Sequence, residues 1–125
     1  MKLAIARQEL ALLVANATTD ETGVVDHIPD AIAPPVVFVA WSDPWLAKST
    51  FCAWQASMEL VLVAQRIEPG GKTATLEDMV SSLVPAIKQS EMFTIVDVTA
   101  PYPLNVAGVD YLAASINITH DLEDY

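Results

Sequence analysis

The chain of 125 residues carries sixteen acidic and six basic side chains, which give a formal net charge of −10. This length suits one domain with a core of its own and is too short for two ordinary domains. Nucleic-acid binding depends on clustered Lys and Arg, and the basic residues here are scattered, so tight binding of DNA or RNA is disfavoured. The single cysteine, Cys52, excludes a disulfide framework and favours a reducing compartment.

The N-terminal segment is rich in Ala and Leu but does not have the form of a secretory signal. Arg7, Gln8 and Glu9 interrupt its apolar run before it reaches signal-peptide length. No later stretch approaches the length needed to span a bilayer. We therefore expect a soluble protein that is synthesised in the cytoplasm.

The first predicted element is an amphipathic helix from Lys2 to about Asn16, because apolar residues recur there at helical spacing. Gly23 to His27 is a short candidate strand, which Pro29 restricts to a sheet edge or to an extended loop. Residues 28–35 hold three prolines and show no clear period. They predict an extended connection to the next element.

Two strands are predicted in the middle of the chain. Val36 to Trp41 is apolar on both faces, which favours a central strand, and Ser42-Asp43-Pro44 is expected to turn the chain out of it. Thr50 to Arg66 shows a sustained alternation over about twice the usual strand length. One face of this long strand is apolar and the other mixes apolar with polar residues, a pattern typical of an antiparallel sheet.

A second helix is predicted after the Pro-Gly-Gly breaker that follows the long strand. Thr75 is expected to cap this helix, and Asp78 stands where its side chain can return the capping bond. Pro85 lies well inside the helical pattern. It is expected to kink the helix or end it early, because proline removes a backbone donor and crowds the preceding turn.

Two further strands, Phe93 to Thr99 and Val109 to His120, are separated by the proline-containing break 100–103. The acidic C-terminal end, residues 121–125, is expected to be mobile. The whole pattern predicts one α+β domain over residues 1–125. Its sheet is mostly antiparallel, with one long strand and with two helices packed on one face.

Candidate catalytic and nucleotide sites are weak. Gly70-Gly71-Lys72-Thr73 lacks the glycine five residues before Gly71 that a phosphate-binding loop requires, since Arg66 stands there. Cys52 with His27 or His120 is the only possible thiol and base pair, and Cys52 lies on the apolar face of the long strand, where burial disfavours the thiolate. The sequence predicts no catalytic residue and no cofactor.

The two histidines have acidic neighbours that suggest metal ligands. His27 stands near Asp26 and Asp30, and His120 precedes Asp121 and Glu123. These spacings match no recognised ligand pattern, and carboxylates beside histidines are expected by chance in so acidic a chain. No metal site is predicted.

Aromatic residues around the loop after the second strand form a more informative candidate site. Trp41, Pro44, Trp45 and Phe51 flank this loop, and Tyr102 lies in the later proline break. Tryptophan is over-represented at the energetic centres of protein interfaces, although two tryptophans can also form a small cluster under a loop. We interpret these five residues as a candidate protein interface.

The order of segments resembles the tail terminator proteins of long-tailed bacteriophages, particularly those of actinobacterial phages. An Ala/Leu-rich helix and a proline pair precede the strand VVFVAW, an aromatic loop and the long strand FCAWQASMELVLVAQR. The helix TLEDMVSSLVPAI and the final segment VDVTAPYPLNVAGVDYLAASINITHDL then complete the pattern. The match lies in order and composition along nearly the whole chain and includes no short diagnostic motif.

The resemblance implies a structural virion protein without enzymatic activity. Its subunits, usually six, would form a homo-hexameric ring on the tail tube, stop tube polymerisation and join the tail to head-completion proteins. DNA would pass through the lumen of the ring without specific binding. The alternatives are another head–tail connector component, such as a stopper, or a small ligand-binding domain or enzyme.

Overall fold

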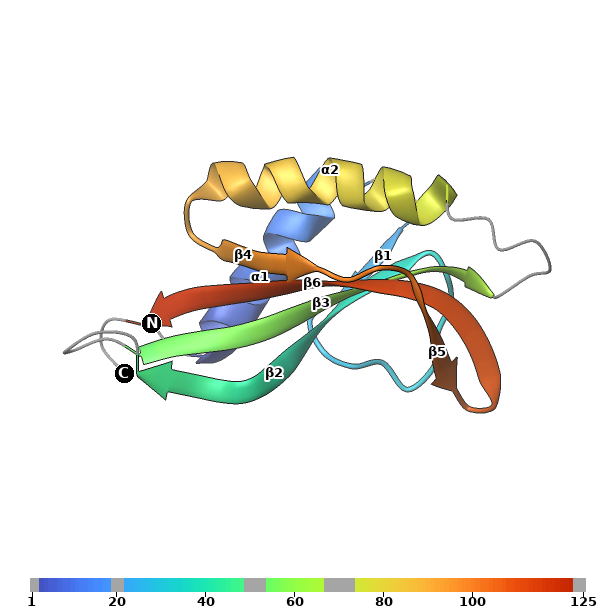
Figure 1. The fold of residues 1–125 in the computed structure, drawn as a ribbon, viewed down its shortest axis with the longest axis horizontal. Coiled ribbons are helices and arrows are strands. Elements are labelled where there is room, and N and C mark those ends of the chain that lie inside the picture. Colours follow the sequence, from blue (N-terminus) through green and yellow to red (C-terminus); the bar gives the residue numbers. More distant parts are fainter. Residues whose placement is uncertain (1–2, 19–21, 49–53, 67–73, 123–125) are drawn as a thin grey trace.

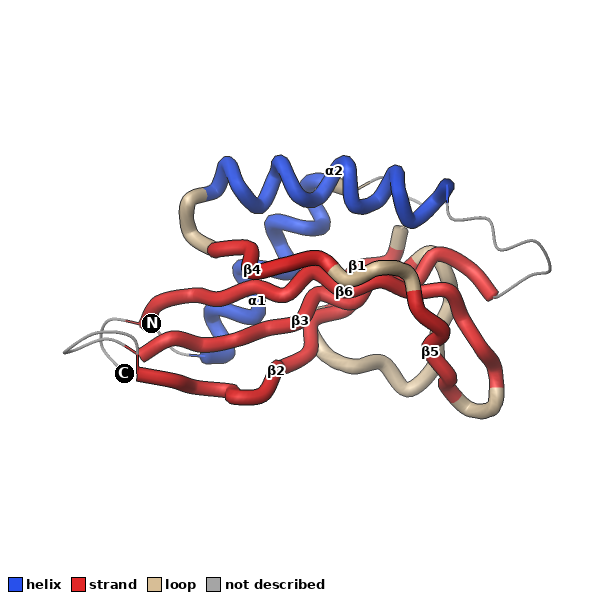
Figure 2. The backbone as a smooth tube through the Cα atoms, viewed as in Figure 1, coloured by secondary structure: helices blue, strands red, loops and turns tan. Residues whose placement is uncertain are grey.

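The computed structural model describes residues 3–18, 22–48, 54–66 and 74–122 of the chain. They form two helices and six strands: α1 (Leu3–Ala17), β1 (Gly23–Val25), β2 (Val36–Lys48), β3 (Trp54–Arg66), α2 (Ala74–Ser90), β4 (Thr94–Val98), β5 (Tyr102–Val106) and β6 (Val109–Leu122). All strands belong to one sheet with the order β1-β2-β3-β6-β4, and β5 pairs with β6 (Figures 1 and 2). The predicted α+β domain with a mostly antiparallel sheet is confirmed.

The long strand β3 lies in the middle of the sheet and is paired on both edges. Leu60 stands opposite Val39 of β2 and opposite Ile116 of β6. Both pairings are antiparallel, whereas the short edge strand β1 runs parallel to β2. The predicted long strand is confirmed over Trp54–Arg66, as are the internal position of the strand that begins at Val36 and an edge strand near Gly23.

Both helices contribute to one buried cluster on the same face of the sheet. Alternate residues of β3 point to this face, and α1 and α2 cover them with side chains at helical spacing. The cluster includes Leu10 and Val14 of α1, Leu76, Leu83 and Ile87 of α2, and Met58, Leu60 and Leu62 of β3. We call this side the helix face and the opposite side the outer face.

A second buried cluster covers half of the outer face. It includes Val61 and Val63 of β3 with Tyr111 of β6, and β5 packs against it through Tyr102 and Leu104. Ala107 and Gly108 form the two-residue turn between β5 and β6, and both have positive φ angles, 53° and 81°. The other half of this face carries mainly polar side chains and is covered by neither cluster of the described residues, so we call it the open half.

The expected turn at residues 42–44 is wrong, and so is one of the two alternatives expected for Pro85, an early end of the second helix. The segment Ser42-Asp43-Pro44 does not turn the chain away, because β2 resumes its pairing with β3 and continues to Lys48. Helix α2 does not end at Pro85 but continues to Ser90, supported by a buried stripe that includes Ile87 beyond the proline. The helix also begins at Ala74, so Thr75 lies inside it and not at the expected capping position.

The described C-terminal part of the chain, up to Leu122, contains more strand than expected. The proline break contains the additional strand β5, in which Pro103 pairs with Leu112 of β6. An edge strand tolerates the missing backbone donor of proline. Asp121 and Leu122, expected to be mobile, belong to β6, and Leu122 is fully buried. None of the described helices is long and apolar enough to cross a membrane.

Leu60 is a direct test of the central position of β3. Leu60→Ala should lower the free energy of unfolding by about 2–5 kcal/mol, because the fully buried side chain would leave a cavity. The matched change Leu12→Ala, on a 59% exposed residue of α1, should alter it by less than about 0.5 kcal/mol. Urea denaturation followed by circular dichroism measures both. Equal losses would contradict this packing.

Candidate functional site

The candidate site begins with a bulge in β2. Trp41 pairs with Met58 and Leu46 pairs with Ala56, so residues 42–45 of β2 lie opposite the single residue Ser57 of β3. The extra residues cannot join the regular ladder and bend the strand locally. The bulge carries three of the predicted interface residues: Trp41 at its start, and Pro44 and Trp45 within it.

The two tryptophans of the bulge are in contact. Their ring centroids lie 5.3 Å apart at an interplanar angle of 45°. Trp41 is half-buried and packs against the cluster on the helix face, whereas Trp45 is 50% exposed. The core therefore holds Trp41, and Trp41 in turn holds Trp45 at the surface in a tilted arrangement that is favourable for aromatic rings.

Of the other predicted interface residues, Tyr102 lies apart from this pair, in a different cluster. Tyr102 packs against the second cluster on the outer face, and its hydroxyl lies 2.6 Å from Oγ of the buried Ser115. Pro44 is exposed within the bulge. Phe51 lies outside the described residues.

An open concavity of about 470 Å³ lies beside the bulge on the open half of the outer face. Four strands contribute to it, because Glu59 of β3 stands opposite Asn117 of β6, which in turn stands opposite Asp97 of β4. The Asn117 amide donates a hydrogen bond to the Asp97 carboxylate. The lining of the concavity includes Trp41 and Asp43 of β2 together with Ser57, Glu59, Asp97, Asn117 and Thr119.

The carboxyl groups of this concavity were not predicted as part of a site. In the sequence, Glu59 falls on the mixed face of the predicted long strand and Asp97 within the predicted strand Phe93 to Thr99, and neither pattern indicates a site. Alternating polar residues in β3 and β6 carry the signal, since residues of one face line up across paired strands. Only the strand register identifies these residues as neighbours, because it places β6 between Glu59 and Asp97.

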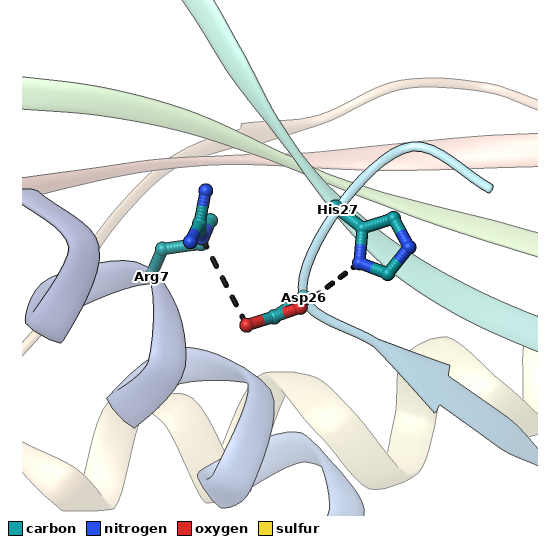
Figure 3. A network of polar contacts seen from close by, with 3 residues as sticks. All are labelled: Arg7, Asp26 and His27. Atoms are coloured by element: carbon teal, nitrogen blue, oxygen red, sulfur yellow. Dashed lines mark hydrogen bonds and ion pairs between the residues drawn. The ribbon is translucent and has the colours of Figure 1, made fainter.

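The first histidine belongs to a small polar contact and not to a metal-ligand cluster (Figure 3). Nδ1 of His27 lies 3.0 Å from one Asp26 oxygen, and Nε of Arg7 lies 3.9 Å from the other, an ion-pair distance too long for a hydrogen bond. The His27 hydrogen bond, followed by the Arg7 charge, outweighs desolvation and lowers the pKa of Asp26. A guanidinium beside this carboxylate opposes the binding of a further cation there.

The second histidine, His120, is part of the core. Its Nδ1 donates to the carbonyl oxygen of Met92 at 2.7 Å, and its ring lies 5.1 Å from that of Phe93. The side chain is buried, so these contacts explain its position at the end of β6 without a ligand. Within the described parts of the chain, no group of three His, Cys, Asp or Glu side chains is placed to hold a metal ion.

The remaining sequence candidates, Cys52 and residues 70–73, lie outside the described residues, as does Glu123. Comparison with known proteins adds no further residue. No protein-family model matches the chain, and no curated protein matches it at a significant level.

The hydroxyl group of Tyr102 is expected to make the free energy of unfolding depend on pH. Burial raises the pKa of Tyr102 above its usual value of 10.0, more than the hydrogen bond with Ser115 lowers it. The unfolded chain therefore loses this proton at a lower pH than the folded chain. The contribution of the Tyr102 hydroxyl to the free energy of unfolding is complete below the pKa of this group in the unfolded chain. It is lost as the pH rises through the pKa of the same group in the folded chain.

We expect Tyr102→Phe to be about 1–2 kcal/mol less stable than the unaltered protein at neutral pH, because the Ser115 hydroxyl is buried without its partner. The difference should shrink above about pH 10, where only the unaltered protein has this phenol to ionise. Ser115→Ala removes the same hydrogen bond but keeps the phenol, and serves as the control. Urea titrations across this pH range measure the effect, and a constant difference for Tyr102→Phe would contradict it.

Proposed function

We propose that this protein is a structural assembly component of the tail terminator type. Its subunits form a ring, six by resemblance, on the last ring of a phage tail tube. The ring stops tube polymerisation and presents a surface to the head-completion proteins. The observation that supports an assembly role best is the exposed Trp45, held by Trp41 on a strand bulge, because such rigid aromatic groups act as anchors in protein interfaces.

The sheet offers surfaces that suit a ring. Strands β1 and β4 lie at opposite ends of the strand order, so each has one edge without a partner strand among the described residues. A head-to-tail contact between two different surfaces of identical subunits closes into a ring when the rotation allows it. The net charge of −10 favours passage of DNA through such a ring without binding, since like charges repel.

Deletion of the gene from its phage or prophage genome tests this proposal. Electron microscopy of the resulting particles should show headless tails of abnormal length, because tube growth has lost its stop. Tails of normal length that are separated from heads would instead indicate a stopper. Normal virions would contradict both assignments.

Trp45→Ala tests the anchor within the same system. The variant should remain folded, at a cost of about 0.5–1.5 kcal/mol for the lost contact with Trp41, but should reproduce the deletion phenotype when it replaces the natural gene. Leu12→Ala also removes an exposed apolar side chain, on α1, and should support normal assembly. Equal phenotypes of the two variants would contradict the assignment of Trp45 as the anchor.

A further inference from the structure

We propose that the concavity beside the bulge docks a protein segment that presents Arg side chains. The proposal rests on the proposed function in one respect, since it treats the bulge surface as an interface and names the chemistry of the partner. The concavity lies on the half of the outer face that neither the helices nor the second cluster covers. Within the described part of the chain, this sheet face has no covering element and is available to another molecule.

Charge complementarity determines the kind of partner. Asp43, Glu59 and Asp97 line the concavity, and its lining includes no Lys, Arg or His side chain among the residues that the structure describes. Two strand spacings separate the backbones of Glu59 and Asp97, about 10 Å, so the carboxylates are close enough for their fields to add. An approaching cation is attracted by all three, while an anionic surface is repelled.

The neighbouring groups favour guanidinium over ammonium. Trp41 lines the same concavity from the β2 side, and the exposed Trp45, which contacts Trp41, lies on the bulge beside it. Arginine stacks on aromatic rings and binds carboxylates in a planar, two-pronged geometry, whereas lysine offers a compact and strongly hydrated charge. Ser57, Asn117 and Thr119 supply polar neighbours along the floor.

A second copy of this chain does not suit this surface. Each copy carries a net charge of −10, and its six basic residues are separated from one another along the sequence. Of these, Arg7 already lies beside Asp26, while Lys48 and Lys88 are near the ends of β2 and α2. The complementary cluster of Arg side chains therefore belongs to a different protein.

The test measures binding of a fluorescently labelled octapeptide of alternating Arg and Ser to the full chain by anisotropy. Three variants are compared. The first combines Asp43→Asn, Glu59→Gln and Asp97→Asn, and the control combines Glu9→Gln, Asp30→Asn and Asp78→Asn. The third carries the single change Glu59→Gln. Both triple changes alter the net charge from −10 to −7, because each removes three carboxylates. The control carboxylates are exposed and do not line the concavity.

We expect the first triple change to weaken binding at least about tenfold and the control to weaken it less than about twofold. A peptide with Lys in place of Arg should bind several-fold more weakly. If the first triple variant does not fold, Glu59→Gln alone should still weaken binding more than the whole control does. Nuclear magnetic resonance should place the peptide-induced shifts at Asp97, Asn117 and the Trp45 indole.

Equal weakening by the two triple changes would overturn the proposal, because binding would then follow net charge and not this surface. Equal binding of the Lys peptide would also overturn the proposal. Chemical-shift changes at the same residues with Mg²⁺ alone, and none with the Arg peptide, would overturn it as well. The deletion phenotype separates the two proposals. Overlong tails without peptide binding would reject only the partner chemistry, and peptide binding with normal virions would reject only the terminator role.

Discussion

The pairing of β3 with β2 on one edge and β6 on the other is the constraint on which the rest of the structure depends. It sends Met58, Leu60 and Leu62 to the helix face and Ser57 and Glu59 to the outer face. A slip of one residue would exchange these sets, exposing the core and burying a carboxylate. The helices, the β5–β6 hairpin and the polar concavity all take their positions from this register.

The bulge in β2 shows how the same constraint separates the site from the core. Pairing of β2 with β3 is regular as far as Trp41 and resumes at Leu46, so the inserted residues have fixed ends. Trp41 remains anchored in the cluster on the helix face, while Trp45 is displaced into solvent. An interaction site held at both ends by a paired strand is positioned more rigidly than one on a free loop.

The sequence predicts elements whose signal extends over many residues, including both helices, the long strand and the central position of β2. Several of its failures concern prolines: Pro44, Pro85 and Pro103 are interpreted as interruptions or a kink, yet each lies inside a strand or helix. Local backbone preferences are worth a few kcal/mol, and pairing with β3 or β6, or burial of a helix stripe, can outweigh them.

In the candidate site, the residue type alone identifies the tryptophans. The carboxylates could not be identified as a site from the sequence, because Glu59 and Asp97 become neighbours only through Asn117 of β6.

The strongly negative charge of the chain acts at two length scales. Over distances beyond the Debye length, about 8 Å at physiological salt, the net charge is largely screened and affects encounter rates more than contact energies. At the concavity, three carboxylates from different strands line one surface, and a docked partner would displace part of the solvent that screens them. Under the proposed docking of a cationic segment, the same excess of acid that repels polyanions provides an attraction whose geometry is set by strands β2, β3 and β4. That geometry depends on the sheet register, so the surface is specified by the fold and not by composition alone.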